Sequence, residues 1–76
     1  MEKITLTVEG NTGIAKIEWI EENQYSVAHY VAFILAPYQN SRWESLFVYD
    51  KDKLPEAMKK AKQYLEMALL RCTLCG

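Results

Sequence analysis

The chain has 76 residues, half of them hydrophobic and a quarter charged, and its formal net charge is −1. This length allows one small domain over residues 1–76, and the composition is typical of a folded protein rather than a disordered one. The near-zero net charge excludes a strong overall attraction to a polyanion.

The first twenty residues are typical of an antiparallel hairpin. Residues 2–9 and 14–20 both alternate between apolar and polar side chains, which predicts two half-buried strands. Residues 10–13 (GNTG) tolerate positive φ, so we expect the chain to turn there. The apolar side of this hairpin is formed by Ile4, Leu6, Val8, Ala15, Ile17 and Trp19.

Residues 25–36 are mostly apolar, and their pattern fits two kinds of secondary structure. β-branched and aromatic residues favour a strand, whereas three alanines spaced four apart favour a helix. The absence of a polar stripe disfavours a surface helix in so small a domain, so we predict a strand that ends before Pro37. One side of it would carry Tyr25, Val27, His29, Val31, Phe33 and Leu35, and the other Ser26, Ala28, Tyr30, Ala32, Ile34 and Ala36.

Residues 42–50 predict a fourth strand in which both rows of side chains are apolar. We expect Leu46 and Val48 to point into the core, although the reverse assignment fits the pattern too. The row that would then point away from the core contains Trp43, Phe47 and Tyr49.

Residues 54–70 predict an amphipathic helix, which must lie on the strands because one apolar stripe cannot stabilise it alone. Pro55 suits the first turn, where its missing N–H has no partner. Met67 and Leu70 fall on the polar side of the helical wheel. The apolar arc, roughly 140° wide, contains Leu54, Ala57, Met58, Ala61, Tyr64, Leu65, Ala68 and Leu69.

Together these elements predict an α+β fold of order ββββα, a four-stranded antiparallel meander with one amphipathic helix packed on one face. If residues 25–36 were helical, the order would be ββαβα. One helix covers only one face of the sheet, so the opposite face has no cover. A contiguous apolar patch on such a face is typical of an interaction surface. We expect the binding residues there to be the aromatic ones, Tyr30, Trp43, Phe47 and Tyr49.

These features favour a non-enzymatic interaction module that self-associates as a dimer or binds a protein partner. The alternative is a single-stranded nucleic-acid-binding protein that stacks bases on the same aromatic residues. Only Lys16 and Arg42 accompany those residues, which favours the protein partner. The sequence contains no recognisable catalytic triad or phosphate-binding loop, and we predict no catalytic residues and no cofactor.

A metal or redox role for Cys72 and Cys75 is the weakest hypothesis. Their C-x-x-C spacing occurs in zinc and dithiol sites, but a zinc site needs four ligands and the chain adds only His29. A redox motif usually opens a helix, whereas this one follows the predicted helix. We expect residues 72–76 to form a frayed tail.

No secretory signal is visible, and no apolar run approaches the ~20 residues that span a bilayer. We therefore expect a cytoplasmic protein with no membrane association.

Overall fold

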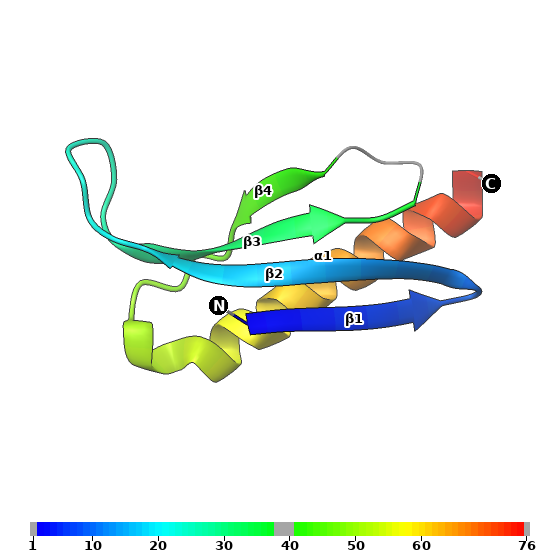
Figure 1. Ribbon diagram of the computed structural model, residues 1–76, viewed down its shortest axis with the longest axis horizontal. Helices are drawn as coiled ribbons and strands as arrows, with labels where there is room; N and C mark the ends of the chain where they lie inside the picture. Colours follow the sequence, from blue (N-terminus) through cyan, green and yellow to red (C-terminus); the bar gives the residue numbers. More distant parts are fainter. Residues whose placement is uncertain (1, 38–40, 76) are drawn as a thin grey trace.

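The computed structural model describes residues 2–37 and 41–75, with the backbone alone for residues 72–75. Its elements are β1 (Glu2–Val8), β2 (Asn11–Ile20), β3 (His29–Leu35), β4 (Arg42–Ser45), the short 3-10 helix η1 (Lys51–Lys53) and α1 (Leu54–Cys75). The strands form one antiparallel sheet in chain order, β1-β2-β3-β4, and α1 lies across one face of it (Figure 1). This architecture confirms the predicted ββββα fold and rules out the ββαβα alternative.

The turn between β1 and β2 is shorter than predicted and lies earlier in the chain. Val8 pairs directly with Asn11, so Glu9 and Gly10 alone form the loop. Both have left-handed backbones, with φ of 49° and 84°. Positive φ at both central residues is the signature of a type I′ turn, whose twist matches that of the flanking strands. Consequently β2 begins at Asn11, and Gly13 lies within the strand instead of in the turn.

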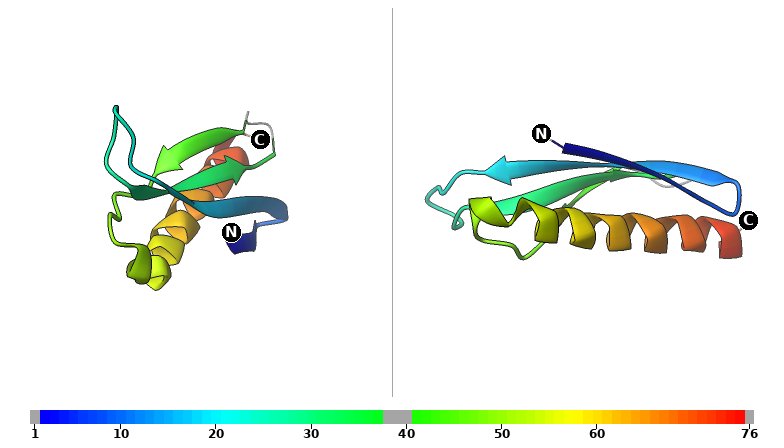
Figure 2. Two further views of the ribbon diagram at one scale, coloured as in Figure 1. Left: turned by 60° about the vertical axis from the view of Figure 1, so that its left-hand side comes forward. Right: turned by 90° about the horizontal axis from the view of Figure 1, so that it is seen from below.

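The sheet and α1 form two layers with a single core between them (Figure 2). The helix packs mainly against β2 and β1 and less against β3, so it leaves β4 largely uncovered. The predicted helical phase is correct, because the whole apolar arc is buried or packed against the core and both Met67 and Leu70 are exposed. The buried residues are Ala15, Ile17, Tyr30, Ala32, Ile34, Ala36, Leu46, Val48, Ala57, Ala61, Leu65 and Leu69.

Small residues allow the helix to approach the sheet closely. Gly13 faces the last buried turns of α1, and a Cβ atom placed on it would lie 2.8 Å from Leu65 Cδ1 and 3.1 Å from Leu69 Cδ2. The same atom would lie 3.0 Å from the backbone oxygen of Leu35. Ala15 and Ala32 are also fully buried on this face of the sheet. The small residues at these positions therefore leave the space that α1 needs to lie close to the sheet.

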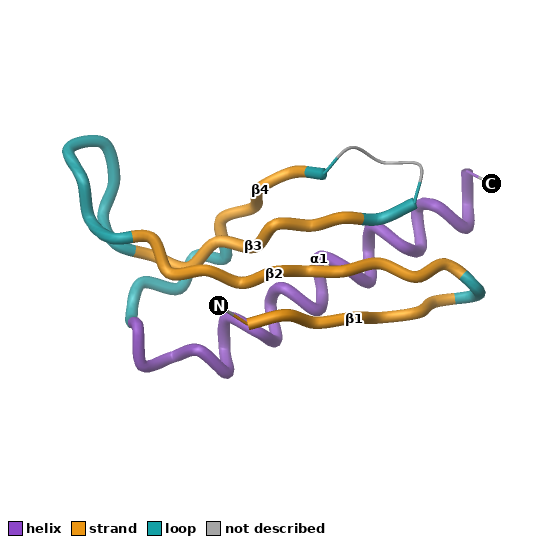
Figure 3. The backbone as a smooth tube through the Cα atoms, viewed as in Figure 1, coloured by secondary structure: helices purple, strands orange, loops and turns teal. Residues whose placement is uncertain are grey.

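The start of β3 differs from the prediction, which begins the strand at Tyr25. The strand begins only at His29, and residues 21–28 form a loop that projects from one end of the sheet (Figure 3, teal). Within this loop Asn23 Oδ1 accepts hydrogen bonds from the backbone amides of Tyr25 and Ser26. Residues 29–35 are strand as predicted, so the helical alternative is wrong for this segment.

The chain leaves β4 through a backbone irregularity at Phe47. The carbonyl of Tyr30 accepts a hydrogen bond from the amide of Leu46, whereas the amide of Tyr30 donates to the carbonyl of Val48. Phe47 therefore bulges out between two residues that both point into the core, and its φ of 57° is left-handed. The predicted strand 42–50 is regular only over residues 42–45, although Leu46 and Val48 are buried as expected.

The helix ends later than predicted. The backbone of α1 continues to Cys75, five residues beyond the expected end at Leu70. The side chains of residues 72–75, and all of residue 76, lie outside the described part of the chain, so the frayed tail stays a prediction. Among the described residues, no helix is long and apolar enough to cross a membrane.

Candidate functional site

The uncovered face of the sheet carries a row of side chains that crosses three strands. Lys16 on β2 is directly opposite Phe33 on β3, which is directly opposite Trp43 on β4. Directly opposite residues of an antiparallel pair point to the same face, so these side chains are neighbours. The rings of Phe33 and Trp43 have centroids 5.1 Å apart and planes inclined by 55°. This separation is in the range of a favourable aromatic contact.

The apolar surface extends along β3 on both sides of that row. Val31 is half-buried, and Leu35, which is opposite Ile14, is 46% exposed. At the other end of β3 the ring of His29 lies 6.4 Å from that of Tyr49, which is 58% exposed. The uncovered face therefore presents apolar and aromatic side chains along the full length of β3.

The β1 half of the same face is polar. Lys3 is directly opposite Lys16, and the hydroxyl oxygens of Thr7 and Thr12 lie 2.8 Å apart. Glu18 on β2 lines a shallow depression together with Lys16, Phe33 and Trp43. The face is thus divided into a polar half on β1 and β2 and an apolar half on β3 and β4.

The prediction that Tyr30 lies on this face is wrong. Tyr30 is 5% exposed and points toward α1, with its ring edge-on to Trp19 at a centroid separation of 4.8 Å. Its hydroxyl donates a hydrogen bond to the backbone carbonyl of Lys51. Tyr30 is therefore a core residue that connects the sheet to the start of the helical segment.

Phe47 is exposed as predicted, but it lies on the other side of the sheet. Its neighbours at the surface are residues of α1, namely Lys60, Gln63, Tyr64 and Met67. The bulge after Leu46 changes the alternation of side chains, so Phe47 does not follow the direction of Trp43. Of the four predicted binding residues, Trp43 lies on the uncovered face, whereas Tyr30 and Phe47 do not. Tyr49 lies at the end of the sheet, with His29 on one side and a depression that it lines with Phe47, Lys53 and Glu56 on the other.

Phe33 and Leu35 belong to this face and were missed as binding residues. The prediction that Tyr30 lies on the uncovered face puts their row of β3, with His29 and Val31, in the core, and because both rows are apolar the pattern does not correct this. The size of the side chains could have identified the row that faces the helix. The row with Ala32 and Ala36 has the smaller side chains, and a helix can approach a sheet closely only where the side chains beneath it are small.

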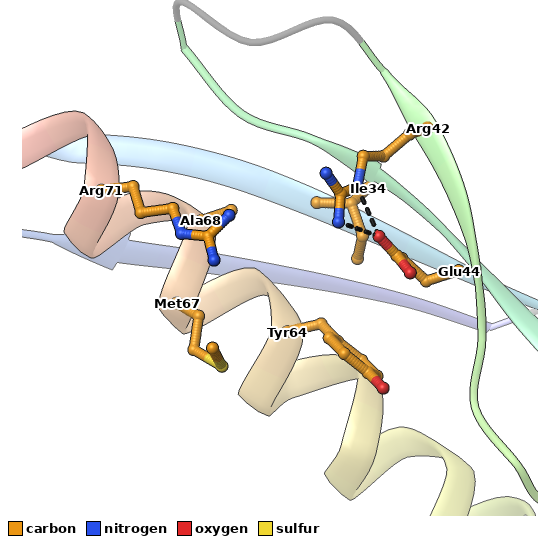
Figure 4. A pocket seen from close by; sticks show the side chains of 7 residues that line it. All are labelled: Ile34, Arg42, Glu44, Tyr64, Met67, Ala68 and Arg71. Carbon is orange, nitrogen blue, oxygen red and sulfur yellow. Dashed lines mark hydrogen bonds and ion pairs between the residues drawn. The ribbon is translucent and has the colours of Figure 1, made fainter. Parts of the chain in front are cut away.

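A second, smaller depression lies on the helix side, between β4 and α1 (Figure 4). Arg42 and Glu44 of β4 form an ion pair on one wall, and Tyr64, Met67 and Arg71 of α1 form the other wall. The depression exists because α1 does not pack on β4, which leaves a gap between the strand and the helix. An exposed ion pair of this type contributes little to stability.

The described residues contain no group of three or more His, Cys, Asp and Glu placed to hold a metal ion. The C-x-x-C pair Cys72 and Cys75 lies outside the described side chains, so its proposed metal or redox role has no geometry to support it.

Comparison with known protein families, with curated protein sequences and with solved structures gave no significant match. The function is therefore inferred from the chemistry and geometry of the surface alone.

Proposed function

We propose that the protein is a non-enzymatic interaction module that binds a protein surface, either a second copy or a different partner, through the apolar half of its uncovered sheet face. The observation that carries this proposal is the apolar surface formed by the half-buried Phe33 and the exposed Leu35 and Trp43, which α1 cannot cover because it lies on the other side. Large contiguous apolar patches are uncommon on monomers and mark interaction sites.

The composition of this surface supports a protein partner. Aromatic side chains with few rotatable bonds are typical anchors of protein interfaces, and anchors gather near the centre of the contact. Trp43 is 58% exposed and already contacts Phe33, so it can lose further surface to a partner without a large change of conformation. The polar half on β1 and β2 would then form part of the rim.

The test compares two aromatic residues of nearly equal exposure on opposite sides of the sheet. Trp43 is 58% exposed on the uncovered face, and Phe47 is 60% exposed beside α1. Trp43→Lys should abolish binding because it would bury a charge without a partner at the centre of the contact. Phe47→Lys is the matched control and should leave binding unchanged. Sedimentation at several concentrations measures self-association, and circular dichroism checks that both variants remain folded.

The same pair of variants tests a heterologous partner if Trp43→Lys leaves the self-association of the wild type unchanged. Binding of a protein captured from cell extract should then be lost with Trp43→Lys and kept with Phe47→Lys. Equal behaviour of the two variants in both assays would contradict the proposal, since the uncovered face would then have no special role.

The second candidate is single-stranded nucleic-acid binding, which one observation of the register favours. Lys3, Lys16, Phe33 and Trp43 form one continuous row across all four strands on the uncovered face. Bases stack on aromatic rings while nearby cations bind the phosphates. Tight binding of a labelled oligonucleotide that weakens steeply with added salt, and is lost with both Trp43→Lys and Lys16→Glu, would favour this candidate. The net charge of −1 opposes it.

A further inference from the structure

The two edge strands of the sheet differ in how well they are protected against pairing with another strand. β4 has only four residues and is followed by the bulge at Phe47, and both features hinder the addition of a strand. β1 has seven residues in regular register with β2, and it contains no proline, glycine or bulge. Because β1 is at the end of the strand order, its outer edge has no neighbouring strand within the described chain. A long regular edge of this kind is a template for strand pairing.

The apolar side of β1 is only partly covered by α1. Ile4, Leu6 and Val8 pack against the core and yet remain half-exposed, unlike the fully buried Ala15 on β2. The first turns of α1 lie beyond the start of β1 (Figure 1, lower left). At this end of the helix the apolar side chains of Leu54 and Met58 are also only half-buried. A strand added beside β1 would bury more of the apolar side chains of β1.

We propose that two copies of the chain pair through β1, antiparallel to each other and centred on Leu6, to form one continuous eight-stranded sheet. In this register Leu6 is opposite Leu6 of the second copy, Ile4 is opposite Val8, and Thr5 is opposite Thr7. Every apolar residue then meets an apolar residue on the helix side, and threonine meets threonine on the uncovered face. Matched cross-strand pairs are the unit of stabilisation in a sheet.

Charge complementarity favours this register. It brings Lys3 close to Glu9 of the second copy, the turn residue that directly follows β1, at both ends of the contact. Within its own chain Lys3 is instead directly opposite another cation, Lys16, and neither Lys3 nor Glu9 forms an ion pair with the described residues. The neighbouring register, centred on Thr5, would place the carboxylate of Glu2 opposite the apolar Val8. The register centred on Leu6 therefore brings opposite charges together and also pairs apolar residues with apolar residues.

The outward backbone groups of β1 fit the same register. In an antiparallel pair, backbone hydrogen bonds alternate, so every second residue directs its amide and carbonyl away from the neighbour. Residues flanking a two-residue turn bond to each other, which directs Val8, Leu6 and Ile4 toward β2. Thr5 and Thr7 then direct their backbone groups outward, and in the proposed register these two residues are opposite each other. This edge contact does not depend on the proposed function, because it uses the edge of the sheet rather than its uncovered face.

The experiment is a charge exchange across the edge, measured by sedimentation equilibrium at low ionic strength. Lys3 lies near the start of β1 and Glu9 in the turn directly after its end, and both are exposed, so exchanging their charges does not disturb the core. Lys3→Glu alone, or Glu9→Lys alone, turns two attractive contacts per dimer into two repulsive ones. Each should raise the dissociation constant of the dimer about tenfold. The double variant Lys3→Glu/Glu9→Lys should return the dissociation constant to near the wild-type value.

Trp43→Lys separates this edge contact from the face contact of the proposed function. It should leave the edge dimer intact, because Trp43 lies on β4 at the far side of the sheet. A wild type that stays monomeric at all concentrations would overturn the edge proposal. Single variants that dimerise like the wild type, or a double variant that is as weak as the single ones, would overturn it too.

Discussion

Gly13→Ala tests whether the close approach of α1 to β2 determines the stability of the fold. The added methyl group would overlap Leu65 Cδ1 at 2.8 Å and the carbonyl oxygen of Leu35 at 3.0 Å. The leucine end can turn aside, but the carbonyl belongs to the backbone of β3 and moves only with the strand. Overpacking of a close-packed core destabilises by about 1–3 kcal/mol.

An opposing effect must be subtracted from that figure. Gly13 does not have positive φ, so alanine is compatible with its backbone and restricts the unfolded chain. Such a replacement stabilises by about 0.4–1 kcal/mol. The net result should be a loss of about 1–2 kcal/mol in the free energy of unfolding. For a chain of this size, each kcal/mol corresponds to a decrease in Tm of about 4–8 °C.

Urea denaturation followed by circular dichroism measures this change. Gly10→Ala is the matched control, because an added Cβ there meets nothing within 4 Å while the φ of 84° disfavours alanine. Its loss would arise from the turn, and shortening Leu65 should not relieve it. The loss from Gly13→Ala should become smaller when Leu65 is also replaced by alanine, because the two sites are in contact. If Gly13→Ala is as stable as the wild type, the helix is not closely seated on β2 and the reasoning fails.

Two further predictions concern the turn and the helix. Glu9→Gly should stabilise the protein by about 0.5–1 kcal/mol, because glycine adopts the left-handed φ of 49° without steric strain, and a higher urea midpoint would show it. Leu65→Ala should cost about 2–5 kcal/mol, since Leu65 is fully buried, whereas Met67→Ala should change stability by less than about 0.5 kcal/mol, since Met67 is 53% exposed. Similar losses from Leu65→Ala and Met67→Ala would mean that the face of α1 has been misassigned.

The helical phase was predictable from the sequence, whereas the orientation of β3 was not. A 3.6-residue period separates Leu65 from Met67 unambiguously, because the opposite side of the helix is charged. On β3 both rows are apolar, so a period of two fails to distinguish the row of Tyr30 from that of Phe33. Which row of β3 faces the helix depends on packing in the folded protein, because small side chains such as Ala32 fit beneath α1.

The position of Phe47 could not be derived from alternation. A phenylalanine at positive φ is rare, and no glycine or asparagine marks the bulge in the sequence. Regular alternation from Trp43 onward therefore predicts the wrong side of the sheet for Phe47. Trp43 itself was placed correctly, because it lies before the irregularity, in the part of β4 that pairs regularly with β3.

The contact between the last helix and the first two strands has a consequence for the order of folding during synthesis. Neighbouring strands of the sheet are also neighbours in sequence, so each hairpin can form as soon as its second strand emerges from the ribosome. However, the hairpin of β1 and β2 keeps its apolar side exposed until α1, which follows all four strands in the chain, can pack on it. The nascent chain thus carries an unprotected sheet until α1 has been synthesised. This interval is the stage at which aggregation, or capture by a chaperone, is most favoured.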